Sequence, residues 1–542
     1  MANSIKTAVA ILDVKENTKY PIQHAELLYN EKITSNNLAY GGIHPLVALE
    51  SHRKHLSGLV QKALYCLPPA RNDVLNSHEL LLSNGLRVEK PNAVAVTRGP
   101  GMRSSLMAGL DTAKGLAVAW NVPLIGVHHM QAHALTPRLC AALEQYTSPI
   151  EQNVGLQPAF PFLTLLISGG HTLLLHSTGI ANHSILANTD DIAIGDCLDK
   201  CARSILPQSL LDSSKDVSYG RLLESFAFPI PGPHAYDETA LSRGRGVRAF
   251  QSPYGWQLPV PLLATRGGQK SKSMKFSYTG LVTFATRVAE KGWVDGRLCK
   301  QPRKVPMPEQ EARYLAREVM RIAFEHLASR VSLQIERERV AHEITPTTPI
   351  SNALVISGGV AANQYLRHVF QSQPSLAHLE IIIPPIDLCT DNAAMIAWAA
   401  HEMLPLLHPR MDKMPGRHQP WEPQQGQLEM DVLRKWSLEN ILHPETELDA
   451  RDRIGDAATA LGRDPSALGD TSLVNQESHQ FERRCVVPRE SVHALTLISS
   501  KMKGAISDSC GSSNESLLPS TDDVVKSQQQ MQNEQSSRNT LG

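Results

Sequence analysis

Two short glycine-rich sequences, each at the end of a buried apolar run, constrain the fold of this chain more than any other feature. Residues 166–170 read LISGG and residues 355–359 read VISGG. A strand that ends in Ser-Gly-Gly lets the backbone turn sharply and point its N–H groups at an anion. The first copy continues as HTLLLH, which predicts a hairpin back into a strand, and the second continues as VAANQYLRHVF, which predicts a helix. One copy alone would indicate only a turn, but two copies in two α/β halves favour duplicated lobes that hold a nucleotide between them.

Strands and helices alternate along the rest of the chain. Such alternation predicts helices layered on a sheet. We therefore expect an α/β fold with two duplicated lobes of the actin/sugar-kinase/Hsp70 (ribonuclease H-like) class and a cleft between them. The apolar pattern predicts strands at 5–12, 92–101 and 122–129, helices at 45–66 and 105–120, and a further helix from about Met130.

The expected domain organisation follows changes in composition. We expect a first lobe at 1–135, a second lobe at 136–405, a C-terminal helical extension at 406–444 and a disordered tail at 445–542. Within the second lobe, an irregular stretch at about 205–275 is polar and in parts basic, and we expect surface loops there. The tail is rich in Ser, Gln and Asn, and it cannot bury enough apolar surface to offset its chain entropy.

Composition restricts the possible functions only weakly. The 53 Lys and Arg residues balance the 53 Asp and Glu residues, so any contact with nucleic acid must come from a local patch. The eight cysteines form no C-x-x-C motif, which disfavours a zinc ribbon or a thioredoxin-type site and favours a reducing compartment. Cys197 and Cys201 are spaced as buried neighbours on a helix. Since no apolar run approaches the roughly 20 residues that span a bilayer, we expect no association with a membrane.

The sequence HHMQAH contains a candidate metal site. His129 and His133 are four residues apart, so on a helix both imidazoles face the same way, as divalent metals require. Taken without a third ligand, the pair could equally be two ordinary histidines that bind no metal. Asp391 follows an apolar run at 381–384, and a carboxylate at the end of a strand is well placed in an open α/β site. Two histidines and one aspartate leave coordination positions open, as in a catalytic centre. Met130 stands where the zinc-protease signature H-E-x-x-H has glutamate, which disfavours peptide hydrolysis.

Seven motifs occur in a characteristic order. They are VTRGPGMRSSLMAGLDTAKGLA, GVHHMQAHALTP, LLISGGHTLL, GDCLDKCAR, FSYTGL, VISGGVAANQYLR and CTDNAAMIAWAA. Over roughly residues 5–405 the chain resembles the TsaD family of tRNA N6-adenosine threonylcarbamoyltransferases, and HHMQAHAL resembles the bacterial and mitochondrial branch, including fungal mitochondrial members. The resemblance implies an acyltransferase. It would move threonylcarbamoyl from threonylcarbamoyl-adenylate to N6 of the adenosine 3′ of the anticodon, in tRNAs that read codons beginning with adenine, and release AMP.

The resemblance also implies the site residues. His129, His133 and Asp391 would bind one divalent metal ion per subunit, zinc or iron. Asp199 would hold a ribose hydroxyl, although it could also be a solvated or helix-capping carboxylate. Asn363 could instead cap the helix that it opens, and Glu224 could simply be exposed. The full set implied to contact the adenylate is Leu166, Ile167, Ser168, Gly169, Gly170, Asp199, Gly220, Glu224, Ala362, Asn363 and Thr390.

The chain departs from the family pattern in three places. Around Gly220 and Glu224 the spacing of the family's Pro-Gly-Gly-Pro segment is kept, but both prolines and one glycine are absent. Val282 follows FSYTGL where the family has lysine, so a charge that could meet phosphate or RNA is lost. The family's opening strand and acidic loop are absent before Lys6, and we expect the given sequence to begin inside the protein. Loss of such a central strand would leave the backbone groups of its neighbour unpaired.

The resemblance implies partners and a location as well. These are tRNA, the adenylate made by a separate synthase, a second copy of the chain in a homodimer, and the mitochondrion. The basic stretches Arg266–Lys275 and Arg297–Lys304 are candidate phosphate contacts, or else solvated loops. Two other functions stay open. The missing strand and Val282 motivate a catalytically impaired tRNA-binding relative, and the two Ser-Gly-Gly turns alone would also fit an ATP-dependent phosphotransferase of the same fold class.

Overall fold

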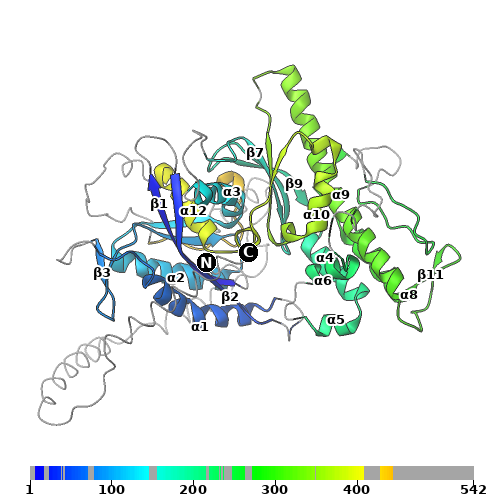
Figure 1. The fold of residues 1–542 in the computed structure, drawn as a ribbon, viewed down its shortest axis with the longest axis horizontal. Coiled ribbons are helices and arrows are strands. Elements are labelled where there is room, and N and C mark those ends of the chain that lie inside the picture. Colours follow the sequence, from blue (N-terminus) through cyan, green and yellow to red (C-terminus); the bar gives the residue numbers. More distant parts are fainter. Residues whose placement is uncertain are drawn as a thin grey trace, which may run out of the picture. The chain divides into compact units, whose positions relative to one another are not determined.

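The largest sheet among the described residues is a mixed sheet of six strands (Figure 1). Its order is β10-β9-β8-β7-β13-β14; β8 pairs antiparallel with β7 and β9, and β13 pairs parallel with β7 and β14. Because β7 and β13 run side by side in the same direction, the two Ser-Gly-Gly turns leave the same edge of the sheet. The strands are β7 (Phe162–Ile167), β8 (Thr172–Ser177), β9 (His183–Thr189), β10 (Lys275–Phe276), β13 (Ala353–Ser357) and β14 (Glu380–Ile382).

The structure is a computed structural model in which only part of the chain is described. The predicted disordered tail lies outside the described residues, as does most of the basic stretch Arg266–Lys275. The described residues are 6–16, 23–37, 40, 43–70, 78–145, 156–214, 219–230, 232, 236, 247–262, 272–347, 349–407 and 428–442.

Helices cover both faces of the six-stranded sheet, as the apolar strands require. Because side chains alternate along a strand, Leu163 and Leu165 of β7 enter one core and Phe162 enters another. The first core is completed by α4 (Ile194–Ile205), α8 (Thr279–Lys291), α9 (Glu309–Ile344) and α10 (Gln364–Gln371). The second core is completed by α3 (His129–Gln145) and α12 (Ala394–Leu407).

Helix α12 is apolar on nearly all sides because it packs against several elements at once. Trp398 is fully buried, and the helix contacts α3 as well as strands outside the six-stranded sheet. A helix that is apolar all round is a core helix. Helices α3 and α12 therefore join the six-stranded sheet to the N-terminal elements.

The N-terminal elements contain two separate pairs of strands. Strand β1 (Lys6–Glu16) pairs antiparallel with β2 (Gln23–Thr34), and β5 (Val94–Gly99) pairs parallel with β6 (Leu124–His128). In the part of the chain that the structure describes, no strand pairs with the other edge of β1 or of β5. Helix α1 (Pro45–Leu64) packs on β1, and α2 (Arg103–Trp120) packs on β5.

The remaining elements are short and connect these layers. They are β3 (Glu79–Leu81), β4 (Arg87–Glu89), α5 (Gln208–Asp212), α6 (Gly220–Ala227), β11 (Trp293–Val294), β12 (Arg297–Leu298), α11 (Ile386–Cys389), and the 3₁₀ helices η3 (Gly359–Ala362), η4 (Pro374–Leu376) and η5 (Leu438–Asn440).

The sequence predictions of local structure hold for most elements. The strands and helices expected in the first 145 residues are present with small shifts at their ends, and the α/β class is confirmed. The hairpin expected after LISGG is the β7–β8 pair, and the helix expected after VISGG begins as η3 and continues as α10. Cys197 and Cys201 are both fully buried on α4, as predicted. None of the described helices is both long and apolar enough to cross a membrane.

The prediction of surface loops at 205–275 is wrong for part of that stretch. Helices α5 and α6 form there, and Trp256 and Phe228 are almost completely buried. Trp256 Nε1 donates to Glu311 Oε1 over 3.3 Å, and the Arg317 guanidinium stacks over Phe228. Both partners belong to α9. Burial against a helix so far along the chain leaves no periodic signal in the local sequence.

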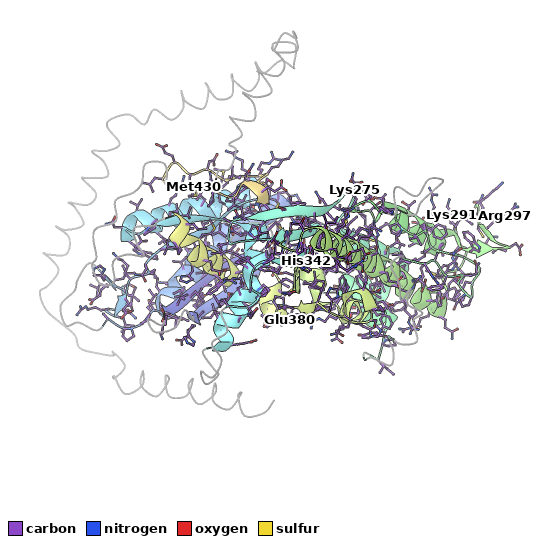
Figure 2. All side chains as sticks on the ribbon, turned by 90° about the horizontal axis from the view of Figure 1, so that it is seen from above. Lys275, Lys291, Arg297, His342, Glu380 and Met430 are labelled. Carbon is purple, nitrogen blue, oxygen red and sulfur yellow. The ribbon has the colours of Figure 1, made fainter. Side chains whose placement is uncertain are left out.

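Residues 428–442, which we call the C-terminal strap, lie across the ends of β5 and β6. Leu433 N donates to Arg98 O over 2.9 Å, and a Cβ at Gly99 would lie 2.0 Å from Leu433 O. Met430, labelled in Figure 2, packs with Val432 against the core of α2 and β5. The strap contains one 3₁₀ turn, η5, and the described residues of the predicted extension at 406–444 otherwise include only the end of α12.

Candidate metal centre and the glycine-rich turns

Two histidines and one aspartate from distant parts of the chain converge at the start of α3. His129 Nε2 lies 3.6 Å and His133 Nε2 lies 3.2 Å from Asp391 Oδ1. One candidate ligand atom from each of the three residues lies within 4.8 Å of the others. Because metal–ligand distances for such atoms are about 2.0–2.2 Å, one ion could contact all three residues after small side-chain movements.

Local structure explains this convergence. Strand β6 ends at His128 and α3 begins at once, so residues four apart on its first turns project to the same side; the His129 and His133 ring centroids are 4.7 Å apart. On the other side, Asn392 fixes the loop that carries Asp391. Its Oδ1 accepts from Met395 N over 3.0 Å, and its Nδ2 donates to Leu388 O over 2.8 Å.

The protonation states suit a metal ion. Burial lowers the pKa of His129 to about 3, against the opposing effect of Asp391, so the imidazole is neutral at pH 7. Burial would raise the pKa of Asp391, but the His129 and His133 imidazoles hold it below its ordinary value. Neutral imidazoles and an ionised carboxylate are the forms that bind metals.

The exposure of the three side chains also fits a bound ion. The Asp391 side chain is 24% exposed, whereas those of His129 and His133 are 7% and 5% exposed. The centre is therefore closed on the histidine side and open on the carboxylate side, where a substrate could approach.

The two Ser-Gly-Gly turns contact each other beside this centre. Leu166 lies opposite Ser357 in the β7–β13 pair. Gly358 has a φ of 104°, and a Cβ there would lie 2.3 Å from Ile167 O, so only glycine fits. His133 Nδ1 lies 3.4 Å from Ser357 Oγ. The second turn therefore borders the candidate metal centre directly.

Hydrogen bonds fix the backbone of the first turn, and the space beside its two glycines is empty. Ser168 Oγ accepts from His171 N over 3.0 Å, and Ser168 O accepts from Gly195 N over 3.1 Å at the start of α4. A Cβ built on Gly169 or Gly170 would meet nothing within 4 Å. Space for a ligand therefore adjoins this backbone. By contrast, the predicted contacts Leu166 and Ile167 have fully buried side chains, so only their backbone could meet a ligand.

Asp199 and Gly220, predicted to act at the adenylate, are in contact. Asp199 Oδ1 accepts from Gly220 N over 3.0 Å at the first residue of α6. Burial raises the pKa of Asp199 to about 6, and the hydrogen bonds from the backbone of Gly220 and Tyr219 oppose this shift. Asp199 thus caps α6, as its structural alternative predicted.

Glu224 and Asn363 meet at the first turn of α10. Glu224 Oε1 accepts from Gln364 N over 2.7 Å and from Tyr365 N over 3.1 Å. Asn363 Oδ1 accepts from Leu366 N over 2.9 Å, so Asn363 caps the helix that it opens. Glu224 is therefore a half-buried helix cap and not a freely exposed side chain. Ala362, in η3, immediately precedes this cap.

Lys32 is a residue near the centre that the sequence analysis did not identify. Its Nζ donates to Thr390 Oγ1 over 3.1 Å and to Asp387 O over 3.2 Å. This ammonium on β2 therefore holds the loop immediately before Asp391. No motif surrounds Lys32, and the contact joins residues 358 positions apart, so no local signal could have revealed it.

The sequence analysis also did not identify His171 as a residue near the centre. Burial lowers the pKa of His171, and its imidazole interacts electrostatically with His133 and Asp391.

Only some of the candidate RNA contacts belong to the described residues. Lys275 forms an ion pair with Asp190 over 2.8 Å, and Arg303 forms one with Glu311 over 2.7 Å. Arg297 is exposed on the β11–β12 hairpin, and Figure 2 shows it beside Lys291 at one end of the described region. Val282, where the family has lysine, is half-buried and packs against the core of α4, α8 and α9.

The unusual pKa of Asp199 gives a prediction about stability. A carboxyl whose folded-state pKa is raised from 3.8 to about 6 binds more protons when folded, so it destabilises the fold as pH rises between these values. Asp199→Asn keeps the oxygen that caps α6 and removes the charge. Between pH 4 and pH 7 the unfolding free energy of the variant should rise relative to wild type by about 2 kcal/mol. Urea titrations at a series of pH values measure this difference.

Asp212→Asn, which removes the same charge from the exposed helix α5, is the control for Asp199→Asn. A difference between Asp199→Asn and wild type that stays constant from pH 4 to pH 7 would contradict the raised pKa.

The contacts of Lys32 give a second prediction. Lys32→Ala removes both hydrogen bonds to the loop before Asp391, so zinc should bind roughly tenfold more weakly, in the range seen when groups that orient metal ligands are lost. Lys32→Arg should restore much of the affinity, since it can donate to the same oxygens. Zinc competition titrations measure the effect. Lys62→Ala, which breaks an exposed ion pair with Glu31, is the control, and an equal loss in that variant would refute a positioning role for Lys32.

The fold and the site together define a class: an α/β protein whose side chains could hold a metal ion beside two glycine-rich turns. Within this class, the sequence model of the TsaD family, described as tRNA N6-adenosine threonylcarbamoyltransferase, matches residues 26–398. The chain belongs to this family, as its motifs predicted.

Curated relatives agree with this assignment. The mitochondrial tRNA N6-adenosine threonylcarbamoyltransferase of Schizosaccharomyces pombe is 28% identical over 456 residues, which cover 82% of this chain and 87% of the relative. The enzyme of the same name from Chelativorans sp. is 31% identical over 68% of this chain and 78% of its own length. The Brucella ovis enzyme is 31% identical over 67% of this chain and 78% of its own length.

Similarity to solved structures is much weaker. The crystal structure of T. kodakarensis HypF has a TM-score of 0.28 and 14% sequence identity over 65% of this chain and 43% of that chain, too low to support a conclusion about fold or function.

Proposed function

We propose that this protein transfers threonylcarbamoyl from threonylcarbamoyl-adenylate to N6 of the adenosine 3′ of the anticodon, in tRNAs that read codons beginning with adenine. Membership of the family and the names of the relatives support this activity. The observation that carries it is the convergence of His129, His133 and Asp391 beside two touching Ser-Gly-Gly turns. The tRNA-binding relative without activity and the phosphotransferase are not favoured, because the matching relatives are named as transferases of this group.

The rate of this reaction depends mainly on how the two reactants are positioned. The exocyclic amine of adenine is a poor nucleophile because its lone pair is delocalised into the ring. In the reaction this nitrogen bonds to the carbamoyl carbon and loses a proton, while the bond from that carbon to the phosphate oxygen breaks and AMP leaves. An enzyme accelerates such a step by holding both reactants in line and by stabilising the charge that develops on the carbonyl and phosphate oxygens.

The residues of the chain fit these tasks. A Cβ at Gly169, Gly170 or Gly359 would meet nothing within 4 Å, so the two turns leave room for a phosphate. The N–H groups of Gly169 and Gly359 could donate to it, whereas Ser168 N already donates to His171 O and Gly170 N to Ser168 Oγ. Asp199 could accept a hydrogen bond from a ribose hydroxyl if it exchanged its bond to Gly220. Glu224 and Asn363, which cap α10, would set the position of the second turn relative to the adenosine.

A divalent ion, zinc or iron, would be held by His129, His133 and Asp391, with Thr390 beside it. When bound there, it would supply Lewis-acid polarisation of a carbonyl or phosphate oxygen. The neutral His129 imidazole and the ionised Asp391 carboxylate support this assignment.

Duplicated lobes, at 1–135 and 136–405, remain part of the proposal. Support comes from a shared order of elements: each half begins with antiparallel strands, β1–β2 or β7–β8–β9, and ends with a parallel pair joined through a helix, β5–β6 or β13–β14. The cleft of such a pair of lobes is where a nucleotide would bind.

The partners of the protein and its location in the cell are also part of the proposal. A separate synthase would supply the adenylate, and a second copy of the chain would complete a homodimer. The mitochondrial name of the fission yeast relative supports a mitochondrial location. Exposed basic side chains such as Arg297 and Lys300 are candidates for contact with the tRNA backbone.

A direct assay tests this function. The purified full chain, loaded with zinc or iron, would be mixed with threonylcarbamoyl-adenylate and a tRNA transcript that reads a codon beginning with adenine. Mass spectrometry of the digested tRNA should detect N6-threonylcarbamoyladenosine. A transcript with guanosine in place of the target adenosine is the control and should give none. Binding of the tRNA without transfer would favour the impaired relative, and ATP-dependent phosphorylation would favour the phosphotransferase.

A further inference from the structure

Both ring nitrogens of His128 bind the backbone of other residues. His128 ends β6, is buried, and immediately precedes the candidate ligand His129. Its Nδ1 accepts from Met130 N over 3.1 Å, and its Nε2 lies 3.0 Å from Trp436 O in the C-terminal strap. Because an amide N–H can only donate and a carbonyl oxygen can only accept, the proton of the ring is on Nε2. His128 therefore accepts from the first turn of α3 and donates to the strap.

The hydrogen bond from Met130 N makes His128 the cap of α3. The first N–H groups of a helix have no partner within the helix, and a side chain just before the helix can accept from one of them. Strand β6 ends at His128 and α3 begins at His129, so no loop residue separates the strand from the helix. The orientation of the His128 ring therefore helps to determine how the first turn of α3 leaves the strand.

The strap holds its end of this bridge by contacts of its own. The ring of Trp436 lies against that of His128, with centroids 4.8 Å apart, and the Arg98 guanidinium lies 5.6 Å from the centroid of the Trp436 ring. Arg98 Nε also donates to Asp431 O over 2.8 Å. Arg98 thus contacts the strap at two points, and these contacts hold the carbonyl group of Trp436 in place.

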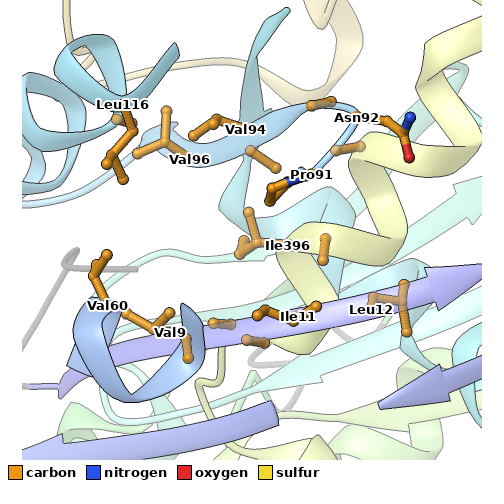
Figure 3. Close-up of a pocket in the computed structure, with 18 of the residues that line it drawn as sticks. Val9, Ile11, Leu12, Val60, Pro91, Asn92, Val94, Val96, Leu116 and Ile396 are labelled. Atoms are coloured by element: carbon orange, nitrogen blue, oxygen red, sulfur yellow. The ribbon is translucent and has the colours of Figure 1, made fainter. Parts of the chain in front are cut away.

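The strap lies on a seat formed by β5 and α2. Val432 of the strap packs with Val96 of β5 in one apolar core, and Figure 3 shows Val96 close to Leu116 of α2. A Cβ at Gly99 would lie 2.0 Å from Leu433 O, so the strap backbone could not keep its place beside any larger residue. The seat therefore fits the strap closely enough to fix its position.

Apolar packing also connects the strap to the surroundings of the candidate metal centre. Leu438 and Ile441 of the strap belong to one apolar cluster with Met130, which stands between the two candidate histidine ligands in the sequence. Leu166, the first residue of the first glycine-rich sequence, belongs to the same cluster. Side-chain packing therefore reinforces the hydrogen bond that joins the strap to His128.

We propose that His128 is a positioning residue for the metal centre and acts as a relay from the strap. Trp436 O fixes the His128 ring, and the ring fixes the N–H of Met130. The first turn of α3 then holds His129 within reach of Asp391. Groups that orient metal ligands change metal affinity by roughly 10- to 100-fold. The inference rests on the proposed function, because it concerns the proposed metal centre.

A substitution at each end of the relay tests this role in the full chain. His128→Asn places an oxygen near the position of Nδ1, so it keeps the cap on α3, but its short side chain cannot reach Trp436 O. Zinc should bind this variant about tenfold more weakly than wild type, as measured by competition titration. Trp436→Ala removes the ring that Arg98 and His128 contact and should weaken zinc binding by a similar factor. Lys435→Ala, at an exposed position of the strap, is the control and should bind zinc as wild type does.

The double variant His128→Asn/Trp436→Ala separates a relay from two independent effects. If the strap acts through His128, the double variant should bind zinc no more weakly than His128→Asn alone, because the first change has already uncoupled the strap. Independent effects would multiply to a loss of about a hundredfold. Circular dichroism checks folding, and His128→Ser, which can also cap a helix, replaces His128→Asn if that variant unfolds.

The results distinguish failure of the relay from failure of the metal centre. Wild type that binds no zinc, or binding that Asp391→Asn leaves unchanged, would refute the proposed centre and the relay together. If that centre holds, wild-type affinity in His128→Asn would refute the relay alone, and so would multiplied losses in the double variant. Weaker binding in both single variants, without further loss in the double variant, is the result that the relay requires.

Discussion

Asp391→Asn is expected to abolish metal binding and the transfer reaction. The substitution keeps the size of the side chain but removes the ionised oxygen that lies near both His129 and His133. Metal affinity should fall by a factor on the order of 100 or more, since a neutral amide is a poor ligand compared with a carboxylate. Metal analysis after dialysis and zinc titration measure binding, and the tRNA assay measures transfer.

Asp387→Asn provides the matched control. Asp387 is an exposed aspartate on α11, four residues before Asp391, and it contacts Lys32 through its backbone oxygen. This control should keep both the metal and the activity. Full metal content together with normal transfer in Asp391→Asn would refute the metal-centred proposal.

Gly358→Ala is expected to cause the largest loss of stability. Gly358 has a φ of 104°, which L-residues rarely adopt, and a Cβ there would lie 2.3 Å from the carbonyl oxygen of Ile167. That oxygen cannot move away easily because β7 and β13 are paired up to this point. The unfolding free energy should fall by about 3–5 kcal/mol, as for severe backbone strain combined with overpacking. Urea denaturation followed by circular dichroism measures the change.

Gly359→Ala is the matched control for Gly358→Ala. A Cβ at Gly359 would meet nothing within 4 Å, and the residue begins η3. Its stability should differ from wild type by less than about 1 kcal/mol. Equal stabilities of the two variants would show that the two glycine turns are not packed as closely as the structure indicates.

The candidate metal centre was the part of the site most accessible from sequence. His129 and His133 fall on one helix, where a spacing of four residues determines that they face the same way. Asp391 was predicted from its position after an apolar run, a rule of α/β folds that needs no knowledge of contacts. The structure brings these three residues together, although 258 positions separate His133 from Asp391.

Other parts of the site depend on contacts between distant elements. Helix α9 was not predicted, and neither was the burial of Trp256 against it, because isolated aromatic residues in a polar stretch show no periodicity. Glu224 could be placed beside α10 only once the fold was known. For Asp199 and Asn363, the sequence left both a capping and a binding role open, and both residues are caps in the structure.

The C-terminal strap extends the folded region beyond the segment that the family model matches. The family match ends at residue 398, yet Trp436 O lies 3.0 Å from Nε2 of His128, the residue before the first candidate ligand, and the Trp436 ring lies under the guanidinium of Arg98. A shortened protein that ends with α12 would expose the apolar side of α2 and β5 that Val432 covers. It would also leave buried His128 without this partner. Proteolysis or premature termination after α12 would therefore disturb the surroundings of the candidate metal centre while leaving every family motif in place.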